Sequence, residues 1–231
     1  CQSMAFLPKA LVVGISGGID SSVVSTLCAL TGRKTIILSM PIRQNKSQHD
    51  LSLKHGEWLS SKFNNVEFNL IELEKIFNSF KETLSKFNNE HGLANSRARL
   101  RMTALYQAAA SNSGIVVGTG NKVEDFGVGF YTKYGDGGVD ISPIADCTKT
   151  QVWEMGKYLG VSKDIINAEP TDGLWDDGRS DTKQLGMTYQ DLEKAMENNS
   201  DPNYKKYLKI RERNLHKMKP IPVCKFKNEK S

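Results

Sequence analysis

The stretch Leu11-Val-Val-Gly-Ile-Ser16-Gly17-Gly18-Ile19-Asp20-Ser21-Ser22 decides the fold of this 231-residue chain. Its first five residues form a short apolar run, which predicts a buried strand. A Ser-Gly-Gly turn follows, and the next residues carry apolar side chains at helical spacing as far as Leu30. The stretch therefore predicts a strand, a tight glycine loop and a helix. This arrangement directs backbone N–H groups and a helix N-terminus at one point, which favours an anion.

The residues of this loop suit a phosphate group. Gly17 and Gly18 let the backbone approach phosphate oxygens, because no Cβ atom stands in the way. Ser16 and Ser21 add hydroxyl donors. Asp20 would repel a phosphate unless a cation lay between them, so its presence indicates Mg²⁺.

Three motifs compete for this stretch. A P-loop requires Gly-Lys-Ser/Thr after the turn, and that sequence is absent. Gly14-Ile-Ser16-Gly-Gly18 matches the G-x-S-x-G nucleophile elbow of serine hydrolases, but that elbow normally follows several strands and only one can precede it here. The third motif is the pyrophosphate loop, S-G-G-x-D-S, which binds the β,γ-phosphates of ATP while the α-phosphate is attacked. A plain glycine-rich turn is the structural alternative, and the Asp20-Ser21 pair after an apolar strand favours the pyrophosphate loop.

The composition is that of a soluble globular protein, and we expect one domain over residues 1–231. Hydrophobic residues make up 39% and charged residues 25% of the chain. The net charge of +5 suits small polyanionic ligands, and no dense basic block with interleaved aromatic residues indicates a nucleic-acid partner. No apolar run approaches the roughly 18 residues of a membrane span. The scattered cysteines without C-x-x-C are typical of reduced thiols, so we expect a cytoplasmic protein.

Strands and helices alternate along the rest of the chain. Further strands are predicted at 34–40, 65–71 and 114–119. Helices are predicted at 19–30, 50–62, 73–87, about 95–112, 148–159 and from Tyr189 and Pro202 onward, before a basic tail that starts at Arg211. The remaining stretches 42–50, 126–138 and 170–185 are predicted as loops, the last one functional and mobile because of its length. The alternation predicts a three-layer α/β fold with a mostly parallel sheet and helices on both faces.

Ligands of such a sheet bind at the carboxyl ends of its strands, where both Ser16–Ser22 and Thr119–Glu124 fall. Glu124 can complete a cation site with Asp20, because two carboxylates, phosphate oxygens and water form an ordinary Mg²⁺ shell. The alternative is a carboxylate at the start of a surface helix, and spacing does not decide between the two.

Two other segments carry charges of interest. In Tyr131–Asp140, Lys133 can hold an anion and Asp140 can accept from an amide or hydroxyl, although spacing alone favours a loop whose aspartates cap turns. Arg97, Arg99 and Arg101 alternate within a predicted helix. They cannot all share one face, so only one or two would reach a ligand.

Several motifs resemble, in the same order, those of the ammonia-dependent NAD⁺ synthetases of the N-type ATP pyrophosphatase superfamily. They are Ser16-Gly-Gly-Ile-Asp-Ser21, Ala98-Arg-Leu-Arg101-Met102, Gly118-Thr-Gly-Asn-Lys-Val-Glu124, Thr132-Lys-Tyr-Gly-Asp-Gly-Gly-Val-Asp140 and Pro170-Thr171 with Leu174-Trp175. The resemblance runs from about Val12 to Lys217. The first motif belongs to the whole superfamily, which has an adenine nucleotide alpha hydrolase-like, Rossmann-like fold. The Thr132–Asp140 segment is far more specific to the synthetases.

The resemblance implies a ligase that amidates deamido-NAD⁺ to NAD⁺, the last step of NAD⁺ biosynthesis. The nicotinate carboxylate attacks the α-phosphate of ATP, pyrophosphate leaves, and ammonia then displaces AMP from the adenylated intermediate. Positioning and charge stabilisation would supply most of the rate. No glutaminase domain is present, so ammonia is the expected nitrogen donor. The family is homodimeric with the dinucleotide across the interface, and we expect a homodimer here.

The same resemblance implies the roles of individual residues. ATP would be bound by Gly14, Ile15, Ser16, Gly17, Gly18, Ile19, Asp20, Ser21, Thr119, Lys149 and Thr171. Mg²⁺ would be held by Asp20 and Glu124, and these two residues with Lys149 would be catalytic. Deamido-NAD⁺ would be contacted by Arg99, Lys133, Asp140, His216 and Lys217.

The chain also departs from the family pattern. Arg179 and Thr182 stand where family members often carry Gln and Glu, so the loop around them is expected to close differently. The helix that usually precedes the first strand is missing, and we expect native sequence before Cys1.

Other functions stay open. They are another pyrophosphatase-loop enzyme that modifies tRNA or makes GMP, a serine hydrolase using Ser16 with His216, and a non-catalytic nucleotide-binding protein. The Thr132–Asp140 segment and the lack of a cationic RNA surface argue against the first.

Overall fold

A parallel sheet forms the centre of the computed structural model, which describes residues 7–171, 173–175 and 180–226. Its strand order is β3-β2-β1-β4, and every pairing is parallel. The strands are β1 (Ala10–Ile15), β2 (Lys34–Ser39), β3 (Val66–Leu70) and β4 (Ile115–Val116). Parallel strands need crossover connections, and helices supply them here.

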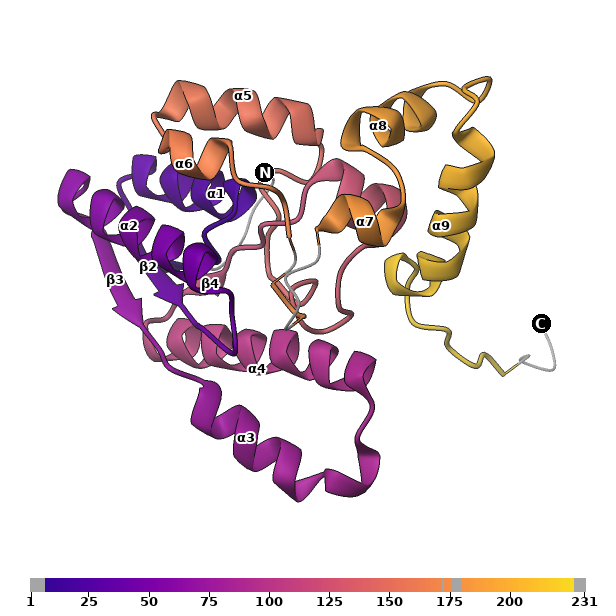
Figure 1. Ribbon diagram of the computed structural model, residues 1–231. Coiled ribbons are helices and arrows are strands. Elements are labelled where there is room, and N and C mark those ends of the chain that lie inside the picture. The colour runs from indigo at the N-terminus through magenta and orange to yellow at the C-terminus, as the bar shows by residue number, and fades with distance from the viewer. Residues whose placement is uncertain (1–6, 172, 176–179, 227–231) are drawn as a thin grey trace, which may run out of the picture.

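Helices cover both faces of this sheet (Figure 1). The helices between β1 and β4 are α1 (Ile19–Leu30) after β1, α2 (Lys46–Lys62) after β2, and α3 (Glu74–Thr83) and α4 (Glu90–Ser111) after β3, with a 3₁₀ turn η1 (Ser85–Phe87) between the last two. The elements after β4 are a π-helical segment η2 (Lys122–Val128), α5 (Lys149–Leu159), α6 (Lys163–Ile166), α7 (Asp181–Leu185), α8 (Tyr189–Glu197) and α9 (Tyr204–Met218). In the described ranges, none of these helices is long and apolar enough to cross a membrane.

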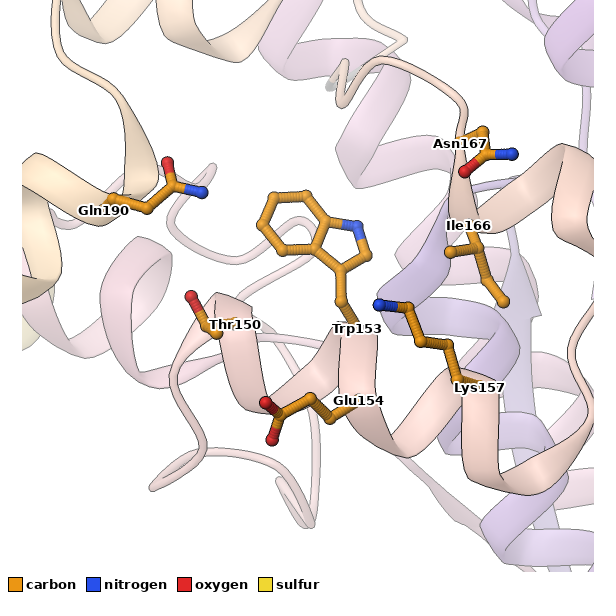
Figure 2. A pocket seen from close by; sticks show the side chains of 7 residues that line it. All are labelled: Thr150, Trp153, Glu154, Lys157, Ile166, Asn167 and Gln190. Atoms are coloured by element: carbon orange, nitrogen blue, oxygen red, sulfur yellow. The ribbon is translucent and has the colours of Figure 1, made fainter.

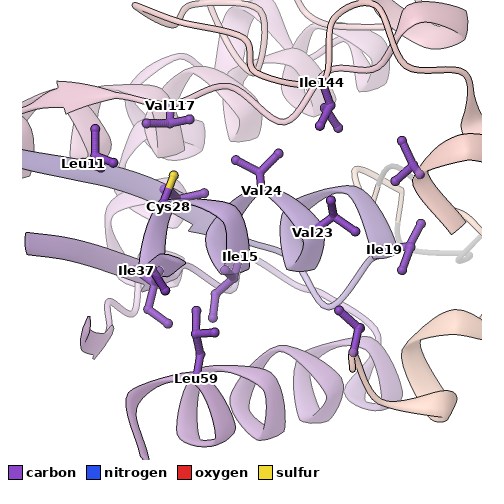
Figure 3. Close-up of a cluster of buried hydrophobic side chains, with 14 of the residues drawn as sticks. Leu11, Ile15, Ile19, Val23, Val24, Cys28, Ile37, Leu59, Val117 and Ile144 are labelled. Carbon is purple, nitrogen blue, oxygen red and sulfur yellow. The ribbon is translucent and has the colours of Figure 1, made fainter. Parts of the chain in front are cut away.

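The side chains of β1 alternate between two hydrophobic clusters. Leu11, Val13 and Ile15 pack with residues of α1, α2, α5 and α6, a cluster shown in part in Figure 3. Ala10 and Val12 point to the opposite face and pack with residues of α3 and α4. Successive side chains of a strand point to opposite faces, so burial on both sides requires a layer of helices on each. The predicted three-layer α/β fold is therefore confirmed.

A third cluster lies away from the sheet, among η2, α7, α8 and α9. The last three of these helices lie together on the right-hand side of Figure 1. Its buried members include Val123, Val128, Leu185 and Leu192. Trp153 of α5 packs against both this cluster and the α1 side of the sheet, and so connects the two.

Two predicted helix starts are wrong, and capping explains both. The second helix begins at Lys46 instead of Asp50, because the Asn45 side chain accepts a hydrogen bond from the Ser47 N–H (3.0 Å). The helix predicted from about Asn95 begins at Glu90. Asn89 caps it by accepting from the Gly92 N–H at 2.8 Å, so Gly92 lies inside the first turn of the helix.

Other boundaries also differ from the prediction. The helix predicted at 73–87 ends at Thr83, and the strand predicted at 114–119 is reduced to Ile115–Val116. The basic stretch from Arg211 is not a separate tail, because α9 includes it as far as Met218. The loops predicted at 126–138 and 170–185 contain parts of η2 and α7, which periodicity could not reveal in such short segments.

Candidate active site

The glycine loop has the predicted position between β1 and α1. Gly18 is the N-cap of α1, and no side chain in the described part of the chain caps this end. The N–H groups of the first turn are therefore available to an anion. The loop is held by its own hydroxyls, since the Ser21 Oγ accepts from the Ser16 N–H (3.2 Å) and donates to the Gly18 carbonyl (3.1 Å).

Gly17 is required by both conformation and space. Its φ is +87°, in the left-handed region, and a Cβ atom here would lie 2.3 Å from the Gln48 carbonyl oxygen of α2. Only glycine fits between the loop and the start of α2.

Asp20 and Glu124 converge on one atom, the Nζ of Lys149. The nitrogen lies 2.6 Å from Asp20 Oδ2 and 2.8 Å from Glu124 Oε1. These residues come from the first turn of α1, from η2 and from the first position of α5. The sequence could not decide whether the two carboxylates meet, and the structure brings them together.

Burial and charge oppose each other in this cluster. Burial lowers the pKa of Lys149, whereas the neighbouring carboxylates of Asp20 and Glu124 raise it. Together the two carboxylates have the larger effect, so the pKa of Lys149 lies above its ordinary value. Burial raises the pKa of Glu124, Lys149 opposes this rise, and Asp20 adds to it. The ammonium therefore stays charged and compensates the two carboxylates.

Three residues that sequence reasoning missed complete the cluster. Asn121 donates from Nδ2 to Asp20 Oδ1 (2.9 Å), and its Oδ1 caps η2 by accepting from the N–H groups of Val123 and Glu124. The Tyr189 hydroxyl lies 2.5 Å from Glu124 Oε1 and 3.0 Å from Asp181 Oδ2. Asn121 and Asp181 lay inside motifs already singled out, whereas nothing local marked Tyr189 beyond its place at a helix start.

The other predicted ATP contacts lie on segments around this cluster. Thr119 lies between β4 and η2. The Thr171 carbonyl accepts from Gln48 Nε2 (3.4 Å), and its hydroxyl accepts from the Gly173 N–H (3.2 Å). Of the two departures from the family pattern, Thr182 lies in α7 with its hydroxyl 3.3 Å from that of Ser180, and Arg179 lies outside the described residues.

A pocket of about 390 Å³ gathers most of the residues predicted to contact the acid substrate. Arg99, Lys133, His216 and Lys217 all line it, together with Asn95, Thr132, Asp136 and Trp175 among others. The indole of Trp175 stacks on His91 with 6.2 Å between ring centroids and donates to Gln184 Oε1 (3.1 Å). Four of the five predicted residues thus meet in one cationic pocket.

Asp140 has a different position from the other four. Its carboxylate accepts from the Val116 N–H (2.8 Å) and from the Tyr106 hydroxyl (3.1 Å), and it does not line the pocket within the described structure. Burial and the carboxylate raise the pKa of Tyr106 to about 12. Asp140 therefore anchors the end of β4.

The cationic side chains that line the pocket also donate hydrogen bonds to backbone carbonyls. Lys217 Nζ donates to the carbonyls of Gly129 and Tyr131, each at 2.8 Å. Lys133 Nζ donates to the His216 carbonyl (3.2 Å), and the Arg99 guanidinium donates to the Lys133 carbonyl (3.3 Å). These contacts fix the pocket wall.

The neighbouring arginines of α4 face other partners. Arg97 donates to the Leu174 carbonyl (3.0 Å) and Arg101 to the Met40 carbonyl (2.9 Å). Neither lines the pocket described above, whereas Arg99 does. Of the three arginines, Arg99 is therefore the one whose side chain lines this pocket within the described residues.

The sequence model of the NAD synthase family matches residues 2–229. The chain belongs to this family. It is 39% identical to the NH₃-dependent NAD⁺ synthetase of Carboxydothermus hydrogenoformans over 187 residues, 80% of this chain and 75% of the relative. The family's synthetases are ligases that form a C–N bond with ammonia, so the predicted family and enzyme class are confirmed.

Solved structures of the family agree with this fold. The NMN synthetase of Francisella tularensis superposes with a TM-score of 0.88 at 34% identity, covering 96% of this chain and 92% of that chain. The NH₃-dependent NAD synthetase of Campylobacter jejuni superposes with a TM-score of 0.75 at 26% identity, covering 96% of this chain and 91% of that chain.

The described contacts of Ser16 do not support the serine-hydrolase alternative. Its hydroxyl lies 3.2 Å from Ser21 Oγ and accepts from the Gly18 N–H, also at 3.2 Å.

Proposed function

We propose that this chain amidates deamido-NAD⁺ with ammonia to form NAD⁺, with ATP cleaved to AMP and pyrophosphate. The observation that carries the proposal is the convergence of Asp20, Glu124 and Lys149 beside the glycine loop, with a cationic pocket on the same molecule. Membership of the NAD synthase family supports the same reaction.

In the first step the nicotinate carboxylate attacks the α-phosphate of ATP, and pyrophosphate leaves. The loop Gly14–Ser21 binds the leaving phosphates through backbone N–H groups at the start of α1. Lys149 stabilises the negative charge that develops on the phosphates, because its ammonium is held charged and buried at the loop. Thr119 and Thr171 complete the ATP site. In the second step ammonia displaces AMP from the adenylated carboxylate.

The residues present also fit a Mg²⁺ ion shared with ATP. Asp20 and Glu124 are hard oxygen ligands, and their two negative charges face the single positive charge of Lys149, so the cluster keeps a net negative charge for a metal cation. The described residues contain no cluster of three or more metal-ligating side chains, which fits an ion that takes its other ligands from phosphate and water. When bound, Mg²⁺ would neutralise phosphate charge.

The acid substrate occupies the pocket lined by Arg99, Lys133, His216 and Lys217, because its phosphates need cations. Asp140 acts on this substrate through the backbone that it anchors. We further propose a single-domain, cytoplasmic enzyme that works as a homodimer. The exposed apolar side chains Ile76 (54% exposed) and Phe87 (78% exposed) beside α4 offer a surface for the second copy.

A second candidate substrate is nicotinate mononucleotide, which would give NMN by the same chemistry. The observation in its favour is the close superposition on the Francisella tularensis NMN synthetase, whose TM-score and identity both exceed those of the Campylobacter jejuni NAD synthetase.

A coupled assay tests both candidates. The intact chain is incubated with ATP, Mg²⁺, ammonium and either deamido-NAD⁺ or nicotinate mononucleotide, and formation of the amide and of AMP is followed. We expect a higher kcat/KM for deamido-NAD⁺. A higher value for the mononucleotide would favour the second candidate, and no turnover with either acid under saturating ammonium would refute both.

A further inference from the structure

We propose that Tyr189 is a positioning residue that couples Asp181, the first residue of α7, to the catalytic carboxylate of Glu124. The inference rests on the proposed function only for its kinetic consequences. The Tyr189 hydroxyl lies 2.5 Å from Glu124 Oε1 and 3.0 Å from Asp181 Oδ2, so one oxygen touches both the active site and the first residue of α7.

The tyrosine ring is held rigidly. It is only 2% exposed and belongs to the cluster that also contains Val123, Leu185 and Leu192. Trp153 meets its ring edge-on, with 5.8 Å between centroids and an interplanar angle of 89°. The indole of Trp153 in turn borders a surface pocket between α5, α6 and α8 (Figure 2). A side chain packed in this way fixes the position of its hydroxyl.

The hydroxyl selects one orientation of Glu124. Glu124 Oε1 also faces Lys149 Nζ at 2.8 Å, and that nitrogen lies 4.8 Å from the centre of the Tyr189 ring. The carboxylates of Asp20 and Asp181 are near, and like charges disfavour a close approach without a donor between them. The phenol has one proton, and its shorter contact donates that proton to Glu124 Oε1, so the hydroxyl keeps Glu124 directed at Lys149.

The same hydroxyl ties this orientation to the loop that carries Thr171. The Asp181 N–H donates to the Pro170 carbonyl (3.0 Å), which joins the end of the segment to its start. The Thr171 carbonyl in turn accepts from Gln48 of α2, and the Gln48 carbonyl is the atom that excludes a side chain at Gly17. Thr171 and Asp181 are therefore connected to the cluster on two sides, Thr171 through Gln48 at the glycine loop and Asp181 through Tyr189 at Glu124.

The principal test is Tyr189→Phe, which keeps the ring and removes the hydroxyl. With either acid substrate, we expect kcat for ATP–pyrophosphate exchange to fall by about 10-fold or more while the KM for ATP changes by less than about two-fold. Tyr207→Phe is the matched control, because Tyr207 is a buried tyrosine of the same cluster that lies outside this chain of contacts. A kcat within about two-fold of wild type for Tyr189→Phe would overturn the proposal, as would an equal loss for Tyr207→Phe.

A double-mutant cycle tests the coupling itself. If Tyr189 transmits the position of Asp181, then Asp181→Asn lowers kcat on its own but causes little further loss in the Tyr189→Phe background. Fully additive losses would overturn the coupling.

The Tyr189–Glu124 contact can be tested without any turnover. Tyr189→Phe and Glu124→Gln should shift the midpoint of urea unfolding non-additively, whether or not the chain acts on either acid. Additive shifts would contradict the contact, whereas non-additive shifts without amidation would refute only the proposed function.

Discussion

Lys149 Nζ lies 2.6 Å from Asp20 Oδ2 and so joins the first turn of α5 to the first turn of α1 across 129 residues of sequence. The Lys149 side chain is 3% exposed, whereas the side chains of Asp20 and Glu124 are 17% and 14% exposed. The two acidic side chains thus keep some access to solvent, whereas the lysine that pairs with them is buried. This relationship puts a fixed positive charge where phosphate charge would develop.

Removal of this charge should affect both stability and catalysis. We expect Lys149→Met to lower the free energy of unfolding by about 3 kcal/mol, because two partly buried carboxylates would lose their partner. The rate of adenylate formation should fall by about 10²–10³-fold. Urea unfolding and ATP–pyrophosphate exchange measure the two effects. Lys157→Met, at an exposed position of the same helix, should leave both near wild type.

The carboxylate of Asp20 is expected to act in chemistry more than in folding. Asp20→Asn keeps the size of the side chain and should reduce the adenylation step by roughly 100-fold or more, since it removes a charge that would bind the metal. Circular dichroism and the unfolding midpoint should remain close to wild type. Asp146→Asn is the matched control, because the Asp146 side chain is 95% exposed and pairs with Lys122. Near-normal activity of Asp20→Asn would contradict the metal role.

The space around Gly17 predicts a specific defect of the loop. A methyl group there would collide with the Gln48 carbonyl, so Gly17→Ala should displace the loop and raise the KM for ATP by about 10-fold or more. Gly32 offers the comparison, since its φ is +71° but a Cβ atom would meet nothing within 4 Å. Gly32→Ala should cost only about 1 kcal/mol of stability from backbone strain and leave the KM for ATP unchanged. Equal effects of the two changes on KM would show that strain alone matters at Gly17.

The pocket cations should govern affinity for the acid substrate. Lys133→Ala removes an ammonium that lines the pocket, and a lost charged contact is worth about 1.5–3 kcal/mol, or roughly 10-fold or more in KM. The KM for ATP should stay within about two-fold. Steady-state kinetics with each substrate varied in turn distinguishes the two constants. Lys34→Ala at the start of β2, where Lys34 pairs with Glu67, should change neither.

The buried histidine of α2 makes stability depend on pH. His55 is 3% exposed, its Nε2 lies 2.9 Å from Ser25 Oγ, and burial lowers its pKa to about 4. In the unfolded chain its pKa is about 6.5, so between these values the unfolded state binds the extra proton. Stability should therefore fall as pH drops, by about 2 kcal/mol between pH 7 and pH 5.

Urea unfolding at the two pH values measures this loss. His55→Gln should be less stable at pH 7 but should lose the part of the pH dependence that His55 contributes. His216→Gln, at an exposed position, should keep the wild-type slope. An unchanged slope in His55→Gln would assign the pH dependence to other groups.

The local sequence was enough to predict those elements whose formation depends on residues adjacent in the chain. The strand, glycine loop and helix around Ser16 were predicted from an apolar run, two glycines and helical spacing, and the structure has them as β1 and α1. The same reasoning failed at Asp50 and Asn95, because a single asparagine cap moved each helix start by several residues. The π-helical segment η2 also escaped prediction, because periodicity could not reveal so short a segment.

The sequence by itself therefore determined the layered α/β fold and the glycine loop between β1 and α1, and its motifs named the residues to consider. Only the tertiary structure decided which of them meet. Asp20, Glu124 and Lys149 come from separate elements, and parallel crossovers bring those elements to one edge of the sheet. Nothing local marked Tyr189 beyond its place at a helix start, because its contacts with Glu124 and Asp181 depend on how its ring packs in the folded chain.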